Sequence, residues 1–167
     1  MTVASFDHLE IPEKKELLYK CCGSKTWVNF MIDLMPFEDL VDVLEDAEQV
    51  WYNCDQADWL EAFSQHPKIG DTNNMKEAFP ATAEIAASEQ SGMNNASGYI
   101  HTEISELNKK YQDKHGFIFI IYASGRSAEI LLQSLKTRIN NDTETELELA
   151  AEEQNKITRS RLEKLFI

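Results

Sequence analysis

His66 is the first residue whose type and position could support chemistry. It lies in the stretch "SQHPKIGD" (residues 64–71), where the apolar helical run "DWLEAF" ends, and it directly precedes Pro67. The residue before a proline is pushed toward extended geometry, so we expect His66 at a helix end on a stiff backbone. Such a histidine could cap the helix, which is the commoner role, or transfer protons near neutral pH. The other histidines (His8, His101 and His115) fall on polar helical surfaces, where solvated or capping roles are expected.

Glu89 and Gln90 lie near the end of a short predicted helix, "ATAEIAASEQ". The helix dipole disfavours an anion at this end. The Glu89 carboxylate is therefore either exposed, which is the usual case, or held against a cationic partner. Lys68 places a cation close to His66 in sequence, although a solvent-facing lysine is the simpler interpretation.

Arg161 occupies an unexpected place in the last predicted helix. At about 100° per residue, its side chain falls within an apolar stripe, whereas Arg159 points to the opposite face. The stripe consists of Leu147, Ala150, Ile157 and Leu165. A buried guanidinium needs an anionic partner. That partner is either an internal carboxylate or an anionic ligand, which arginine can bind through two parallel hydrogen bonds.

Metal and cofactor motifs are not found in the sequence. There is no HxH, HExxH or glycine-rich phosphate loop, and His66 and Asp71 have no second ligand at a suitable spacing. Cys21, Cys22 and Cys54 form no CxxC pair and are odd in number, which favours reduced thiols in small buried positions. We therefore predict no metal and no cofactor.

Length and charge limit the function classes further. The chain has 167 residues and a net charge of −13. The length favours one domain covering residues 1–167, and the charge argues against nucleic acids and anionic membrane surfaces as partners. Since no apolar run reaches membrane-spanning length and "MTVASFDHLE" lacks signal-peptide features, a cytoplasmic location is expected.

The elements that must position these residues are predicted to be helices. Pro12 and Gly23 bound the first predicted helix, and Ser24, Asp55 and Thr143 are expected N-caps, with Glu146 completing a capping box at Thr143. Residues 70–79 are expected to form a polar loop. The remaining apolar stripes predict helices over residues 25–35, 38–53, 56–65, 81–90, 100–115, 125–141 and 143 to near the end of the chain.

The segment "FIFIIYA" (residues 117–123) has the composition of a strand, yet the sequence offers no second strand to pair with it. Its buried backbone groups would need partners from helix ends, a second subunit or a ligand. The alternative is the start of a buried helix. The predicted fold class is therefore all-α, a single compact multi-helix domain with one short extended segment near 117–123.

Several motifs together resemble one known family. They are "HPKIGD", "SEQSGM", "ELNKKYQDKHGFIFIIYASGRS", "EILLQSLKTRINN" and "ELELAAEEQNKITRSRLEKL". In order and spacing they are similar to 2-oxo-4-hydroxy-4-carboxy-5-ureidoimidazoline (OHCU) decarboxylases of urate breakdown, over nearly the whole chain. The resemblance implies an all-helical homodimer that needs no cofactor.

The resemblance also implies site residues. His66 and Glu89 would be catalytic, with Gln90 beside them. The implied substrate-binding residues are Pro67, Ala86, Ala87, Ser88, Glu89, Gln90, Phe119, Ile120, Ile121, Tyr122, Ala123 and Arg161. Ala86 stands where relatives often have serine, so one hydrogen bond to the ligand could be missing.

The implied substrate is a small anionic ureidoimidazoline. Its carboxylate sits on a hydroxylated ring carbon next to a C=N bond, so the substrate can accept the electrons released with carbon dioxide, and no cofactor is needed. His66 would transfer the proton, Glu89 would fix its tautomer, and delivery to one face would yield (S)-allantoin. The alternatives are a lyase or hydrolase acting on a related ureide, and a non-catalytic helical interaction module.

Overall fold

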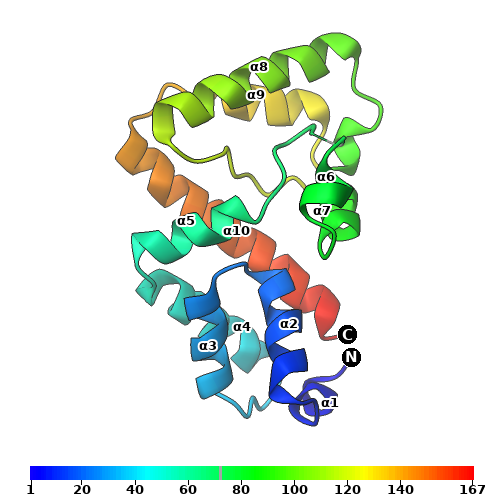
Figure 1. Ribbon diagram of the computed structural model, residues 1–167, viewed down its shortest axis with the longest axis vertical. Helices are drawn as coiled ribbons and strands as arrows, with labels where there is room; N and C mark the ends of the chain where they lie inside the picture. The colour runs from blue at the N-terminus through cyan, green and yellow to red at the C-terminus, as the bar shows by residue number, and fades with distance from the viewer. Residues whose placement is uncertain (72) are drawn as a thin grey trace. The chain divides into compact units, whose positions relative to one another are not determined.

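The computed structural model describes residues 1–71 and 73–167, and these residues form helices without a β-strand (Figure 1). The all-α fold class is therefore confirmed. Residue 72, which belongs to the predicted polar loop, lies outside the described residues. The elements are α1 (Val3–Asp7), α2 (Ile11–Cys21), α3 (Lys25–Asp33), α4 (Leu40–Asn53), α5 (Gln56–Ser64), α6 (Met75–Ala78), α7 (Ala83–Glu89), the 3-10 turn η1 (Ser91–Met93), α8 (Gly98–His115), α9 (Ala128–Arg138) and α10 (Thr143–Leu165).

The chain divides into two compact units. Unit 1 comprises residues 1–62 and 154–167, and unit 2 comprises residues 63–153. Helix α10 contributes residues to both. That residues 1–167 act as one domain stays a prediction.

Unit 1 is built around buried aromatic side chains. Ser24 caps α3 by accepting a hydrogen bond from the backbone N–H of Trp27, as predicted. The Trp27 ring is fully buried, and its indole N–H donates to the Ala47 carbonyl of α4 at 3.0 Å. Phe6 packs edge-on against Phe166, with ring centroids 5.2 Å apart. Burying such large rings supplies much of the stability of a small helical unit.

Unit 2 contains the elements that carry most of the predicted site. Helices α8 and α9 lie side by side in it (Figure 1). Tyr111 of α8 is fully buried and contacts the rings of His115, Phe117 and Phe119, at centroid distances of 4.5, 6.0 and 5.4 Å. This aromatic cluster anchors the segment that follows α8.

Two predictions about loops and helix caps in unit 2 are wrong. The predicted polar loop over residues 70–79 contains the short helix α6. The capping box of Thr143 and Glu146 does not form, because Asp142 accepts the Thr145 backbone N–H at 2.8 Å instead. Glu146 is fully buried and bonds to Arg138, so a partner from α9 takes the carboxylate that the local pattern assigned to the cap.

No helix in the described part of the chain is long and apolar enough to cross a membrane.

Candidate active site

His66 lies just beyond the end of α5, as the sequence predicts. Its backbone N–H bonds to the Phe63 carbonyl at 3.2 Å, and its side chain is half-buried. Pro67 is buried behind it. Four residues later Gly70 adopts a left-handed φ of 82°, which glycine tolerates without strain. The chain therefore turns at Gly70, four residues after His66.

Two side chains fix this loop from other elements of unit 2. The Gly70 N–H donates to Gln90 Oε1 at 3.0 Å, and Asn108 Nδ2 donates to the Ile69 carbonyl at 2.9 Å. Gln90 and Asn108 are both buried, at 7% and 5% exposure. Buried amides bonded to backbone groups hold a loop firmly because leaving any of these groups unpaired is costly. The bond from Gly70 uses the oxygen of Gln90. The side-chain amide also has two N–H donors, which can serve a further partner.

Glu89 is the last residue of α7 and only 9% exposed. The expectation of an exposed carboxylate is therefore wrong. The chain turns directly into η1, whose Met93 is 2% exposed in the core, and so the end of α7 is drawn inward. Ala86 is also buried, whereas Ala87 and Ser88 are exposed.

The segment 119–123 is neither helical nor paired with a strand. Phe119, Ile120, Ile121 and Ala123 are buried, and Tyr122 is half-buried. The helix-start alternative is wrong, and side chains supply partners for the backbone. Arg138 Nη1 donates to the Ile120 carbonyl at 2.7 Å, and the Tyr122 N–H donates to Glu153 Oε2 at 2.7 Å. Helix ends, a second subunit or a ligand had been expected in this role.

Gly92 connects the two stretches implied in substrate binding. A Cβ at this position would lie 2.0 Å from the Arg126 carbonyl oxygen, closer than real Cβ contacts allow. Only glycine permits this approach between η1 and the turn after residue 123. The 66–70 loop, the 86–90 stretch and the 119–123 segment are thus linked within unit 2.

Arg161 belongs to unit 1, so it is not among the residues that the structure brings together within unit 2. It is 7% exposed, as the apolar stripe predicted, and its Nη1 donates to the Lys20 carbonyl near the end of α2 at 2.9 Å. Arg159 is exposed, as predicted, and it pairs with Glu163. The role of Arg161 toward a ligand stays a prediction.

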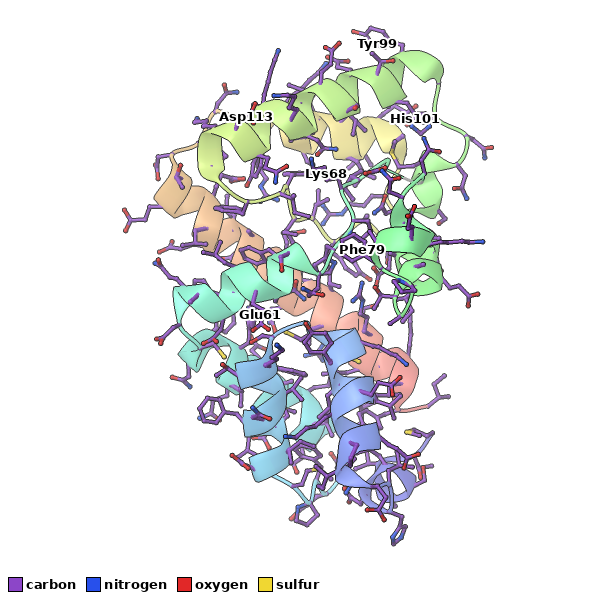
Figure 2. The ribbon with its side chains drawn as sticks, viewed as in Figure 1. Glu61, Lys68, Phe79, Tyr99, His101 and Asp113 are labelled. Carbon is purple, nitrogen blue, oxygen red and sulfur yellow. The ribbon has the colours of Figure 1, made fainter. Side chains whose placement is uncertain are left out.

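A polar cavity of about 680 Å³ lies between the loop after His66 and α8. Figure 2 shows Lys68 on the loop, and His101 and Asp113 on α8, all three of which line it. None of the residues implied as catalytic or substrate-binding is among its lining residues. Its lining includes both basic and acidic side chains, so its charge favours neither an anionic nor a cationic ligand.

His115 differs from its predicted surface role. It is 6% exposed, its Nδ1 lies 2.9 Å from Thr143 Oγ1, and burial lowers the pKa of its ring. The three cysteines are buried thiols, as predicted. Burial raises the pKa of the Cys22 thiol to about 12 and that of Cys54 to about 11, so neither is a ready nucleophile. Within residues 1–71 and 73–167, no group of three or more His, Cys, Asp or Glu could hold a metal ion.

Asn108, Arg138 and Glu153 support the site, and sequence reasoning missed all three. Asn108 did carry a signal, because it lies one helical turn after buried Ile104 and next to the apolar stripe of α8. Arg138 and Glu153 carried none, since charged residues near a helix end or on a long helix are normally solvated.

Comparisons with known proteins agree with the motifs. A family model described as OHCU decarboxylase matches residues 7–163. The uric acid degradation bifunctional protein TTL of Arabidopsis thaliana is 38% identical over 147 residues, covering 87% of this chain and 45% of that protein. The uric acid degradation bifunctional protein PucL of Bacillus subtilis is 26% identical, covering 77% of this chain and 25% of that protein. The OHCU decarboxylase of Halalkalicoccus jeotgali is 26% identical, covering 87% of this chain and 77% of that protein.

Two solved structures are similar as well. A crystal structure of OHCU decarboxylase in the presence of (S)-allantoin has a TM-score of 0.77 and 37% identity, covering 90% of this chain and 97% of that chain. A crystal structure of (S)-allantoin synthase has a TM-score of 0.74 at 17% identity, covering 99% of this chain and 54% of that chain, which shows a shared fold. This chain spans about half the length of the TTL protein and about a quarter of PucL. The match over residues 7–163 confirms the resemblance seen in the motifs, and the chain belongs to the OHCU decarboxylase family.

Proposed function

We propose that this protein is a cofactor-independent carboxy-lyase that converts OHCU to (S)-allantoin. The observation that carries the proposal is the hydrogen bond from the Gly70 N–H to Gln90 Oε1 at 3.0 Å. It joins the loop that bears His66 to the helix end that bears Glu89. Family membership over residues 7–163 supports the same reaction.

The proposed reaction balances without a redox partner. The bond between the ring carbon and the carboxylate breaks, and its electron pair forms a C=C bond with the neighbouring ring carbon. The electrons of the former C=N bond move to nitrogen, which takes a proton. The resulting enol then loses its hydroxyl proton, and the neighbouring carbon takes a proton. Overall one proton replaces carbon dioxide, and the face of the final protonation sets the configuration.

Each chemical need has a proposed group. His66 transfers the proton, since an imidazole is suited to proton transfer at neutral pH. The buried Glu89 carboxylate orients His66, and the N–H groups of Gln90 donate to a carbonyl oxygen of the ligand. Pro67, Ala86 to Ser88 and the backbone of residues 119–123 complete the binding surface, and Arg161 binds the substrate carboxylate.

The proposal includes a cytoplasmic homodimer. The family resemblance supports the dimer, and the acidic composition, with a net charge of −13, agrees with a protein that binds neither nucleic acid nor anionic membranes. Sedimentation equilibrium measures the assembly directly, and a monomer at micromolar concentration contradicts this part of the proposal.

The central test uses freshly generated OHCU. Ultraviolet absorbance follows its consumption, and circular dichroism follows the handedness of the allantoin formed. We expect the wild-type protein to give (S)-allantoin after exhaustive chelation and dialysis. His66→Ala should lower the rate roughly 100- to 10,000-fold, the usual contribution of general acid–base catalysis, and give racemic product. His101→Ala, a histidine outside the proposed site, is the matched control.

Three results contradict parts of the proposal. Equal losses in the two variants argue against His66 as the proton carrier. Recovery by added metal after chelation contradicts cofactor independence. A wild-type protein that leaves OHCU decay unchanged favours a non-catalytic module or a related ureide as substrate.

A further inference from the structure

Two charged side chains of opposite sign bind the backbone of the segment 119–123. The Arg138 guanidinium donates to the Ile120 carbonyl, and the Glu153 carboxylate accepts from the Tyr122 N–H, each at 2.7 Å. The two attachment points are two residues apart. In an extended chain, the backbone groups of such residues point the same way, and those of the residue between them point the other way.

Arg138 is itself fixed by a buried network. Its Nε lies 2.9 and 3.2 Å from the two carboxylate oxygens of Glu146, which is fully buried. Tyr111 Oη and Asn141 Nδ2 also donate to Glu146, at 2.7 and 3.2 Å. The guanidinium carbon lies 4.6 Å from the centre of the Phe119 ring. Arg138 Nη2 is buried without a hydrogen-bond partner. The bonds through Nε and Nη1 nevertheless favour one geometry, because a displacement would leave the buried charge without these partners as well.

The polarity of the two attachments selects one register for the segment. A guanidinium can only donate and an ionised carboxylate can only accept. If the segment shifted by one residue, the groups that face Arg138 and Glu153 would turn to the other edge. The two charges would then lose the carbonyl and the N–H that they now bind, which is costly in a buried site.

We propose that Arg138 and Glu153 are positioning residues for the ureide site. They hold the segment so that the N–H and C=O of Ile121 face the substrate as a donor–acceptor pair, which matches the amide edge of a ureido group or of the imidazoline ring. This inference rests on the proposed function. Neither side chain needs to touch the substrate.

The first test substitutes Glu153. Glu153→Gln keeps an oxygen that can accept the Tyr122 N–H, whereas Glu153→Leu removes the acceptor. Exposed Glu152 is the adjacent control, as Glu152→Leu. We expect Glu153→Leu to raise KM for OHCU roughly 10-fold or more, in line with the loss of a charge-assisted hydrogen bond, and to lower the enantiomeric excess. Glu153→Gln should stay within about threefold of wild type, and Glu152→Leu should be unchanged.

The second test substitutes Arg138 and guards against loss of folding. Arg138→Lys keeps the charge beside Glu146, but an ammonium lacks the planar fork that spans Glu146 and the Ile120 carbonyl. We expect a folded protein with a raised KM. Wild-type KM in both Arg138→Lys and Glu153→Leu overturns the proposal. So does a lowered melting temperature with unchanged KM and handedness, which marks a purely structural role.

Amide hydrogen exchange separates this inference from the proposed function. The Tyr122 N–H should exchange slowly in the wild type and in Glu153→Gln, and at least about tenfold faster in Glu153→Leu, whether or not OHCU is the substrate. Unchanged exchange in Glu153→Leu overturns the positioning role. If the wild-type protein is inactive on OHCU but shows the expected exchange pattern, the proposed function is wrong. The bond of Glu153 to the Tyr122 N–H is then still supported.

Discussion

Arg161 has a partner within unit 1, and it is also proposed to bind the substrate. It is 7% exposed, and one of its nitrogens donates to the Lys20 carbonyl near the carboxyl end of α2. A cation is favourable there, because the last carbonyls of a helix carry partial negative charge. A guanidinium has five N–H donors in a planar fork, so it can bind more than one partner.

Substitution of Arg161 tests its proposed ligand role. Arg161→Gln should weaken allantoin binding roughly tenfold to more than a hundredfold, the typical range for a hydrogen bond to a charged group. Arg161→Lys should recover part of the affinity, and Arg159→Gln, on the exposed face, should bind normally. Calorimetric titration and thermal melts of the three variants distinguish the roles. Normal binding with a much lower melting temperature in Arg161→Gln would assign the residue to the fold alone.

His115 should make the stability of unit 2 decrease at low pH. Burial is the main reason for its lowered pKa, Lys114 and Arg138 lower it further, and Glu146 and Asp142 act in the opposite direction. The unfolded chain therefore binds a proton to this ring more readily than the folded chain does. At pH values well above about 6.5, the pKa of histidine in an unfolded chain, His115 does not affect stability. Stability falls as the pH drops from there toward the lower pKa of the folded state.

Denaturant unfolding at two pH values measures this effect. Between pH 7.5 and pH 5.5, the wild type should lose more unfolding free energy than His115→Gln, which cannot take up the proton. Matched losses in the two proteins would show that His115 does not contribute to acid sensitivity.

The burial of some site residues could be predicted from the sequence, and that of others could not. The burial of Arg161 follows from a regular helix, where 100° per residue places it in an apolar stripe, so the prediction was correct. The burial of Glu89 depends on the turn η1 that follows α7, and that of His115 depends on the aromatic cluster around Tyr111. Both arise from tertiary packing, which the local pattern does not contain.

The elements of the site meet through a backbone contact at Gly92. A Cβ there would come within 2.0 Å of the Arg126 carbonyl oxygen, which leaves no room for a methyl group, and the nearest atoms all belong to the backbone. The carboxyl end of α7 and the turn after residue 123 must therefore move apart if any side chain is introduced. Such a movement would separate the 86–90 stretch from the 119–123 segment.

Gly92→Ala should destabilise the protein by about 1–3 kcal/mol, the usual cost of overpacking, and weaken allantoin binding. Gly98→Ala is the control, because a Cβ at Gly98, in the first turn of α8, meets nothing within 4 Å. It should be neutral or stabilising by up to about 1 kcal/mol. Chemical denaturation and titration check both variants, and equal stabilities would contradict the close contact.

Most helices were predictable because caps and apolar stripes are local. Ser24 and the stripe of α4 are examples. The cap of α10 was predicted wrongly, since Glu146 has the right type and spacing for a capping box but bonds to Arg138, Tyr111 and Asn141 instead. Partners distant in sequence outweighed a local motif.

At the scale of the whole molecule, the two units carry different optical signals. Trp27, Trp51 and Trp59 all belong to unit 1, and unit 2 contains no tryptophan. Tryptophan fluorescence therefore follows unit 1, whereas far-ultraviolet circular dichroism follows the helices of both. This difference makes the prediction of a single domain testable.

If residues 1–167 form one cooperative domain, the fluorescence and dichroism transitions in urea should coincide in midpoint and slope. The Tyr122 and Gly70 amides of unit 2 should then exchange with the same free energy as core amides of α4. Separated midpoints would mean that the units unfold independently and that the chain has two domains.

The spacing of two carboxylates on α10 has a consequence for insertions and deletions. Glu146 supports Arg138 and Glu153 binds the Tyr122 N–H, and seven residues, about two helical turns, separate them. One inserted residue between them would rotate Glu153 by about 100° away from its partner. An insertion or deletion there should therefore abolish the site even if the helix still forms. An insertion after Asn94, an exposed residue that follows η1, should be tolerated.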